Sequence, residues 1–242
     1  MEISAIILIA SVVLLIGISK SAFAGALGIF AVPILMFKFS AIEAITLMLP
    51  LLIIADMMSV KSFWKKWDKA LLAKLIPGAI IGIVCANLLM DFVNADHLRF
   101  FIAFICIAFA VKNMGFKKRQ LSLVNNRFGA YVMSATSGIT STLVHAGGPP
   151  LIIYFTAIGL AQTKFVATAA AFFAIMNIVK LIAVVSLGLL SLDTILTALA
   201  FFPLAFLGNW LGVKINQHLD KQLFLKVMNY LLLILGIWLL SQ

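Results

Sequence analysis

Long apolar stretches follow one another along almost the whole chain, and short polar stretches separate them. The apolar segments cover about 3–18, 22–37, 42–60, 70–92, 98–114, 128–143, 147–160, 164–190, 194–213 and 223–240. A membrane-spanning helix needs ~20 apolar residues. The pattern therefore predicts an all-α membrane protein with about 8–10 membrane segments.

The composition agrees with this class of protein. The 242 residues are 64% hydrophobic and 11% charged, whereas about a quarter of a soluble domain is charged. No linker or low-complexity stretch divides the chain, so we expect a single transmembrane domain over 1–242. The start MEISAIILIASVVLLIG has no Lys or Arg before its apolar run, which predicts a retained span and not a cleaved signal peptide.

The net charge of +10 would suggest a nucleic-acid partner in a soluble protein. Here the basic residues gather in short loops, which indicates membrane topology. The expected partner is thus the lipid bilayer, with no nucleic acid. Cys85 and Cys106 lie inside apolar segments at a spacing that fits no motif, so we expect no disulfide, no metal site and no cofactor.

Two stretches, 1–38 and 128–160, are too long for one straight crossing. A helix of 36 residues would measure about 54 Å against ~30 Å of hydrocarbon. Single crossings would put ten basic residues on one side and six on the other, whereas hairpins put fourteen on one side against Lys38 and Arg99. Because basic loops stay in the cytoplasm, we predict hairpins, cytoplasmic basic loops and both termini outside.

Hairpins give each half an odd number of elements, so the halves have opposite orientations. Matches in the same order support a duplication into repeats 1–115 and 127–242. They pair GALGIFAVPIL (25–35) with TLVHAGGPPLI (142–152), EAITLMLP (43–50) with FVATAAAF (165–172), and IPGAIIG (76–82) with FPLAFLG (202–208). The predicted fold is two inverted repeats, each a broken-helix or re-entrant hairpin followed by three transmembrane helices, as in transporters.

Polar groups and helix breakers concentrate in two segments, ISKSAFAGALGIFAVP (18–33) and TSGITSTLVHAGGPP (136–150). Irregular backbone at membrane depth is tolerated only where protein or a water-filled cavity satisfies it. Helix N-termini with hydroxyl donors suit an anion. The candidate substrate-binding residues here are Ser19, Lys20, Ser21, Gly25, Gly28, Ser137, Ser141, Thr142, His145, Gly147 and Gly148. Small residues also serve close helix packing, and Ser or Thr also bonds its own helix, so both interpretations stay open.

Lys180, Asp56 and His145 are ionisable residues inside apolar segments, where such residues are costly and are candidates for function. Lys180 follows Asn177 by three residues on one helical face, and Asn177 joins the substrate-binding candidates. Asp56 is the expected partner of Lys180, either as a structural ion pair or as one broken by substrate or protons. His145 is a candidate for proton coupling, or it is a histidine bonded to a neighbouring carbonyl.

With these segments in view, the chain resembles the TauE/SafE family of sulfite exporters and related anion permeases. GALGIFAVPIL and the run ending HAGGPPLIIYF carry the family's glycine-rich segment ahead of a proline in each half, and GNWLGVKI (208–215) resembles a later pattern. The resemblance implies about eight spans built by duplication, and transport of sulfite, sulfonates or other small organosulfur anions across the bacterial inner membrane. Phe30 and Ala31 stand where the family favours glycine, and so does His145.

The predicted function is a secondary transporter for a small anion, in particular a sulfur-containing anion such as sulfite or an organosulfonate, and not an enzyme. No P-loop is present for ATP-driven transport. Accumulation of an anion against the membrane potential would need H⁺ or Na⁺ coupling. The alternatives are an anion channel, a non-transporting assembly or sensor protein, and an intramembrane serine-type enzyme that uses Ser141 and His145, four residues apart. The sequence leaves the substrate, the transport direction, the coupling ion and the oligomeric state open.

Overall fold

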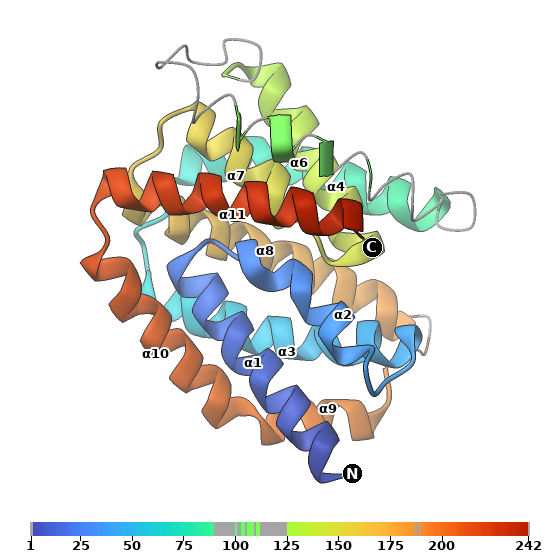
Figure 1. The fold of residues 1–242 in the computed structure, drawn as a ribbon. Coiled ribbons are helices and arrows are strands. Elements are labelled where there is room, and N and C mark those ends of the chain that lie inside the picture. The colour runs from blue at the N-terminus through green and yellow to red at the C-terminus, as the bar shows by residue number, and fades with distance from the viewer. Residues whose placement is uncertain are drawn as a thin grey trace.

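The computed structural model describes residues 2–89, 125–186 and 190–241, together with 100, 103–104, 106–108, 110–111 and 188. Every regular element in these residues is helical, so the expected all-α class is confirmed (Figure 1). The elements are α1 (Ile3–Ala22), the 3₁₀-helix η1 (Ala26–Phe30), α2 (Ala31–Leu35), α3 (Ala41–Ser62), α4 (Lys69–Leu89), α6 (Arg127–Val144), α7 (Gly148–Ala157), α8 (Gln162–Ser186), α9 (Leu192–Ala200), α10 (Phe202–His218) and α11 (Lys221–Ser241).

Five helices of the described residues, α1, α3, α4, α8 and α11, are long and apolar enough to cross a membrane. The bent pair of α9 and α10 raises the number to six. The larger number expected from the sequence also counted shorter segments. Of these, η1 with α2 and α7 are short apolar helices, and most of the segment 98–114 lies outside the described residues.

The apolar segment 194–213 does not form a single straight helix. The chain forms α9 and α10, which meet at Phe201 with a bend of 49°. Pro203 lies in the first turn of α10. A proline has no N–H to donate, and its ring clashes with the carbonyl four residues earlier, so the helix cannot run straight through this point.

The first of the two overlong segments turns back on itself. After α1 the backbone takes a left-handed conformation at Ala24 (φ 53°) and Gly25 (φ 81°). The chain then returns through η1 and α2, until Lys38 Nζ lies 3.4 Å from Glu2 Oε2. The two ends of the segment therefore lie side by side, as a hairpin requires.

The second overlong segment is interrupted at His145. His145 ends α6 with φ 52°, and the N–H of Ala146 bonds back to the carbonyl of Thr140 at 3.0 Å. α7 begins three residues later with Pro149 and Pro150 in its first turn. Prolines suit this position because the first N–H groups of a helix have no partner within it.

Glycines bring two pairs of helices into close contact. α1 packs along α10, and the two run side by side in Figure 1, while α4 packs along α6. A Cβ on Gly17 would lie 2.9 Å from the carbonyl oxygen of Ala205, and a Cβ on Gly82 would overlap the carbonyl oxygen of Ala135. Such close backbone approach is typical of membrane helices, where packing replaces the hydrophobic effect.

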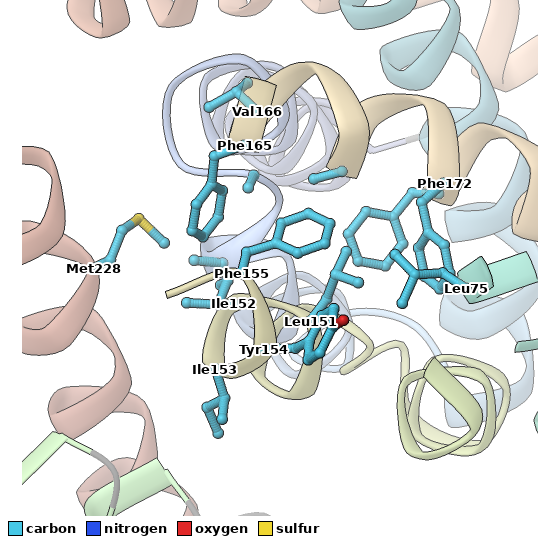
Figure 2. Packing of buried hydrophobic residues seen from close by; sticks show 14 of the residues in the cluster. Leu75, Leu151, Ile152, Ile153, Tyr154, Phe155, Phe165, Val166, Phe172 and Met228 are labelled. Atoms are coloured by element: carbon cyan, nitrogen blue, oxygen red, sulfur yellow. The ribbon is translucent and has the colours of Figure 1, made fainter. Parts of the chain in front are cut away.

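The short helix α7 lies in the middle of the larger apolar core. Nearly all of its residues are buried. Figure 2 shows its side chains against Phe165 and Phe172 of α8, Leu75 of α4 and Met228 of α11. A helix of 10 residues that is enclosed in this way packs against other helices along nearly its whole length. This packing fixes the position of the chain break at His145, which precedes α7.

Candidate functional site

A pocket lies where the two interrupted segments meet, with an empty volume of about 310 Å³. α1, α3, α6, α7, α8 and the turn after α1 all contribute to its wall. Its lining residues are Lys20, Gly25, Gly28, Leu52, Ser141, His145, Gly147, Gly148, Phe173 and Asn177.

A buried ion pair forms one side of the pocket. Lys20 Nζ of α1 lies 2.7 Å from Asp56 Oδ1 of α3, and the two side chains are 7% and 1% exposed. The second carboxylate oxygen, Asp56 Oδ2, accepts a hydrogen bond of 2.5 Å from Asn177 Nδ2 of α8. Lys20 Nζ also lies 4.4 Å from the centre of the Phe173 ring, a cation–π contact. Three helices are joined by this one carboxylate.

The partner of Asp56 differs from the expected one. Lys180 was expected to pair with Asp56, but Lys20 takes that place. Lys180 Nζ instead donates to the Oγ of Ser141 at 2.9 Å and to its carbonyl oxygen at 3.2 Å. The sequence showed both lysines but could not show which of them the tertiary packing brings to the carboxylate.

The contact between Lys180 and Ser141 leaves a hydrogen-bond donor for the pocket. An ammonium group only donates, so the Ser141 oxygen is the acceptor of that bond. The hydroxyl proton of Ser141 is then free for another acceptor, and a charged donor on its oxygen makes it a stronger donor. Ser141 lines the pocket, and Lys180 lies behind it, 5% exposed.

The charges around the pocket do not balance. Lys20 and Asp56 neutralise each other, whereas no carboxylate of the described residues lies within ion-pair distance of Lys180. An uncompensated ammonium in a poorly hydrated interior is costly. A bound anion would remove this cost.

His145 contributes an unpartnered imidazole. Both of its ring nitrogens are buried and have no hydrogen-bond partner among the residues that the structure describes, so the alternative of a bond to a neighbouring carbonyl is not realised there. Its backbone is left-handed, a conformation that glycine adopts at no cost and histidine adopts with strain. A strained residue with a free polar side chain at a pocket is typical of functional positions.

The glycines shape the wall of the pocket in different ways. A Cβ on Gly147 would come within 2.8 Å of the Ser141 Cβ, and a Cβ on Gly148 within 3.2 Å of the Gly25 carbonyl oxygen. These two glycines therefore permit the close approach of the interrupted segments. A Cβ on Gly28 would meet nothing within 4 Å, so the space beside Gly28 is open.

Eight of the residues predicted to bind substrate line the pocket, and four do not. The eight are Lys20, Gly25, Gly28, Ser141, His145, Gly147, Gly148 and Asn177.

The four hydroxyl residues outside the lining make structural bonds. Ser19 Oγ accepts from the N–H of Leu27, and Ser137 Oγ donates to the carbonyl of Gly147. Thr142 bonds the carbonyl four residues earlier in its own helix. Ser21 bonds Ser59 and Asn209, which joins α1, α3 and α10. Asn209 of α10 therefore bonds across the helix interface.

Sequence reasoning missed two apolar lining residues, Leu52 and Phe173. Each lies four residues before a polar residue of the site, Asp56 and Asn177 respectively. Residues four apart share a helical face. A search one helical turn before each buried polar residue would have found both.

The fold and the pocket together define a multi-pass helical membrane protein with a buried, positively charged site between two interrupted segments. The family comparison names the group. The model of the family described as sulfite exporter TauE/SafE matches residues 9–239, so the chain belongs to this family of membrane anion exporters. The expected resemblance is thus confirmed over nearly the whole chain. No curated protein and no solved structure matches the chain.

Proposed function

We propose that this protein is a secondary transporter that moves a small sulfur-containing anion, such as sulfite or an organosulfonate, through the pocket between its two glycine- and serine-rich segments. The observation that carries the proposal is the pair of buried ammonium groups, Lys20 and Lys180, around a single carboxylate, Asp56. The unbalanced positive charge lies beside a pocket, and its natural complement is an anion.

Neutral donors at the pocket would supply the remaining recognition. The hydroxyl of Ser141 and one nitrogen of His145 are free to donate. The first turn of α7 adds the N–H of Gly148, because Pro149 and Pro150 have none. The partial positive charge at the N-terminus of a helix attracts anions. An oxyanion held in this way is bound by these hydrogen-bond donors, by the dipole of α7 and by the one unbalanced positive charge.

The packing supports an inverted repeat as the transport framework. α1 packs on α10 as α6 packs on α4, and α3 packs on α8. Each of the first two pairs joins the first helix of one proposed half to a late helix of the other, and the third pair joins equivalent helices. Repeats of opposite orientation that meet at a central site are typical of transporters that alternate access.

The proposed topology has cytoplasmic basic loops and both termini outside, in a bacterial inner membrane. A membrane potential of ~100 mV, negative inside, favours exit of a monovalent anion by about 2.3 kcal/mol. Export therefore needs no coupling ion, whereas uptake would need H⁺ or Na⁺. Single cysteines at Glu2 and at Lys65, in a Cys85→Ala/Cys106→Ala background, should react with an impermeant thiol reagent from opposite sides.

Flux of radiolabelled sulfite into proteoliposomes tests the function. We expect saturable uptake that shows counterflow and that Lys180→Met and Ser141→Ala each reduce at least 10-fold, the effect of a lost charge-assisted contact. The matched control is Lys214→Met, because Lys214 lies over Trp210 on an exposed part of α10. Unsaturable flux without counterflow would show a channel, and no flux of sulfite or sulfonates would overturn the proposal.

An intramembrane hydrolase is the second candidate, because Ser141 Oγ lies 2.9 Å from Lys180 Nζ. A serine beside a lysine base recurs in hydrolases. The pair of Ser141 with His145 that the sequence suggested does not form, since both His145 nitrogens are unpartnered. Covalent labelling of Ser141 by a fluorophosphonate would favour the hydrolase, and absence of labelling with intact sulfite flux would favour the transporter.

A further inference from the structure

Asn177 presents a hydrogen-bond acceptor that the protein does not use. Its side chain lines the pocket and the residue is 1% exposed, yet within the described part of the chain Oδ1 has no hydrogen-bond partner. A buried unpaired acceptor is costly, and its presence in a native structure calls for an explanation.

The orientation of the Asn177 amide follows from its neighbour. The Asp56 carboxylate lies 2.7 Å from the Lys20 ammonium, and a carboxylate in such an ion pair only accepts hydrogen bonds. The amide nitrogen of Asn177 must therefore face Asp56 Oδ2, 2.5 Å away. The oxygen Oδ1 is held on the other side of the amide and cannot exchange places with the nitrogen.

The pocket thus offers an acceptor as well as donors. Ser141 and one nitrogen of His145 donate, while Asn177 Oδ1 and the other nitrogen of a neutral His145 accept. A fully deprotonated oxyanion could use only the donors. It would face the oxygen of Asn177 with another oxygen and leave that acceptor unpaired.

From this arrangement we infer that the pocket selects a singly charged anion that carries one hydrogen-bond donor, so that its form of sulfite is hydrogensulfite and not the dianion. The inference rests on the proposed function and names the protonation state of its substrate. Asn177 is then a specificity-determining residue: its Oδ1 accepts the proton of the substrate, while the donors hold the other oxygens.

The charge of the site agrees with a monoanion. The ionisable groups around the pocket are Lys20, Asp56, Lys180 and His145. With His145 neutral and Lys180 protonated, Lys20 and Asp56 cancel and one positive charge remains. A monoanion makes the buried site neutral, whereas a dianion leaves one uncompensated negative charge in a poorly hydrated interior, which is costly.

Chlorate is the first probe, because it is a pyramidal monoanion of the same shape as the sulfite group but has no proton to donate. Unlabelled chlorate and hydrogensulfite compete with radiolabelled sulfite in proteoliposomes held at mildly acidic pH. We expect hydrogensulfite to inhibit at a concentration at least 10-fold lower than chlorate does, the effect of one hydrogen bond and its unpaired acceptor. Equal inhibition would overturn the inference.

Selenite is the second probe, because its last ionisation occurs at a higher pH than that of sulfite. If the pocket selects the protonated monoanion, the apparent affinity for each anion falls as pH passes that anion's own ionisation. The fall for selenite then lies at higher pH than the fall for sulfite. Coincident pH profiles would place the titrating group on the protein and overturn the inference.

The Asn177→Ala variant removes the acceptor. We expect the preference for hydrogensulfite over chlorate to fall from at least 10-fold to less than about 3-fold. Asn209→Ala is the matched control, because Asn209 is also a buried asparagine but lies between α1, α3 and α10, outside the pocket lining. Its preference should be unchanged, and a ratio is insensitive to the amount of folded protein.

The failure of this inference is distinguishable from the failure of the proposed function. If neither anion competes and no sulfite flux is found, the transport proposal itself is wrong. If sulfite is transported but chlorate competes as well as hydrogensulfite does, transport stands and the selection of a protonated anion is wrong. An unchanged preference in Asn177→Ala would remove Asn177 from recognition.

Discussion

Replacing His145 by glycine, and by alanine for comparison, separates the conformational strain of its backbone from the role of its imidazole in binding the anion. His145 has φ 52° at the end of α6, and its imidazole lines the pocket with both nitrogens unpartnered. Glycine suits this backbone better than any residue with a Cβ. The chain therefore carries a strained residue at a position where a glycine would end the helix without strain.

The expected magnitudes follow from the two comparisons His145→Gly and His145→Ala. Both variants remove the imidazole, but alanine keeps the Cβ that makes a left-handed backbone unfavourable by about 1 kcal/mol. The glycine variant should be more stable than the alanine variant by that amount, or roughly 2–4 °C in Tm for a chain of this size. Both should raise the KM for sulfite by at least about 10-fold, because each removes one donor to the anion.

Thermal unfolding in detergent, followed by tryptophan fluorescence, measures the stability difference, and proteoliposome flux measures KM. Equal Tm values for the glycine and alanine variants would show that the backbone at this position is not strained. An unchanged KM in both would show that the imidazole does not contact the substrate. Either result would refute the corresponding step of the reasoning.

Three further changes test the pocket and its frame. Gly28→Leu should place its side chain in open space of the pocket and reduce flux more than 10-fold with little change in Tm. Gly28→Ala should reduce flux much less. A marked fall in the Tm of Gly28→Leu would contradict this, because it would show that the variant is destabilised and not only blocked. Gly82→Ala should destabilise the protein by about 1–3 kcal/mol, because its Cβ would overlap the carbonyl of Ala135; an unchanged Tm would show that α4 and α6 are farther apart. Lys20→Met should cost about 3–5 kcal/mol by leaving the Asp56 carboxylate unpaired, and adding Asp56→Asn should recover most of that loss; a double variant as unstable as the single one would show that the ion pair is not the cause.

Much of the fold was predictable because hydrophobicity acts locally. The apolar runs predicted α1, α3, α4, α8 and α11 to within a few residues. The glycines and prolines predicted where the chain breaks before α7. The bend between α9 and α10 was missed because Pro203 lies within an apolar run, and hydropathy does not register the lost N–H of a proline.

The candidate site was predictable in part. Residue type and depth drew attention to Lys20, Ser141, His145 and Asn177, all of which line the pocket. The same criteria also selected Ser21, which bonds across a helix interface instead. A buried hydroxyl has the same appearance in a sequence whether it faces a pocket or another helix, since only its neighbours distinguish the two.

The amino-acid order settles the membrane class, the positions of most helices and the supply of buried charges, because each of these depends on the composition of a contiguous stretch of chain. It does not settle how those charges are paired. Two buried lysines of the same chemistry could pair with Asp56. Lys20 of α1 forms the ion pair, while Lys180 of α8 donates to Ser141. That outcome depends on distances between helices that are far apart in the chain. The unbalanced charge beside the pocket exists because packing brought three such helices together.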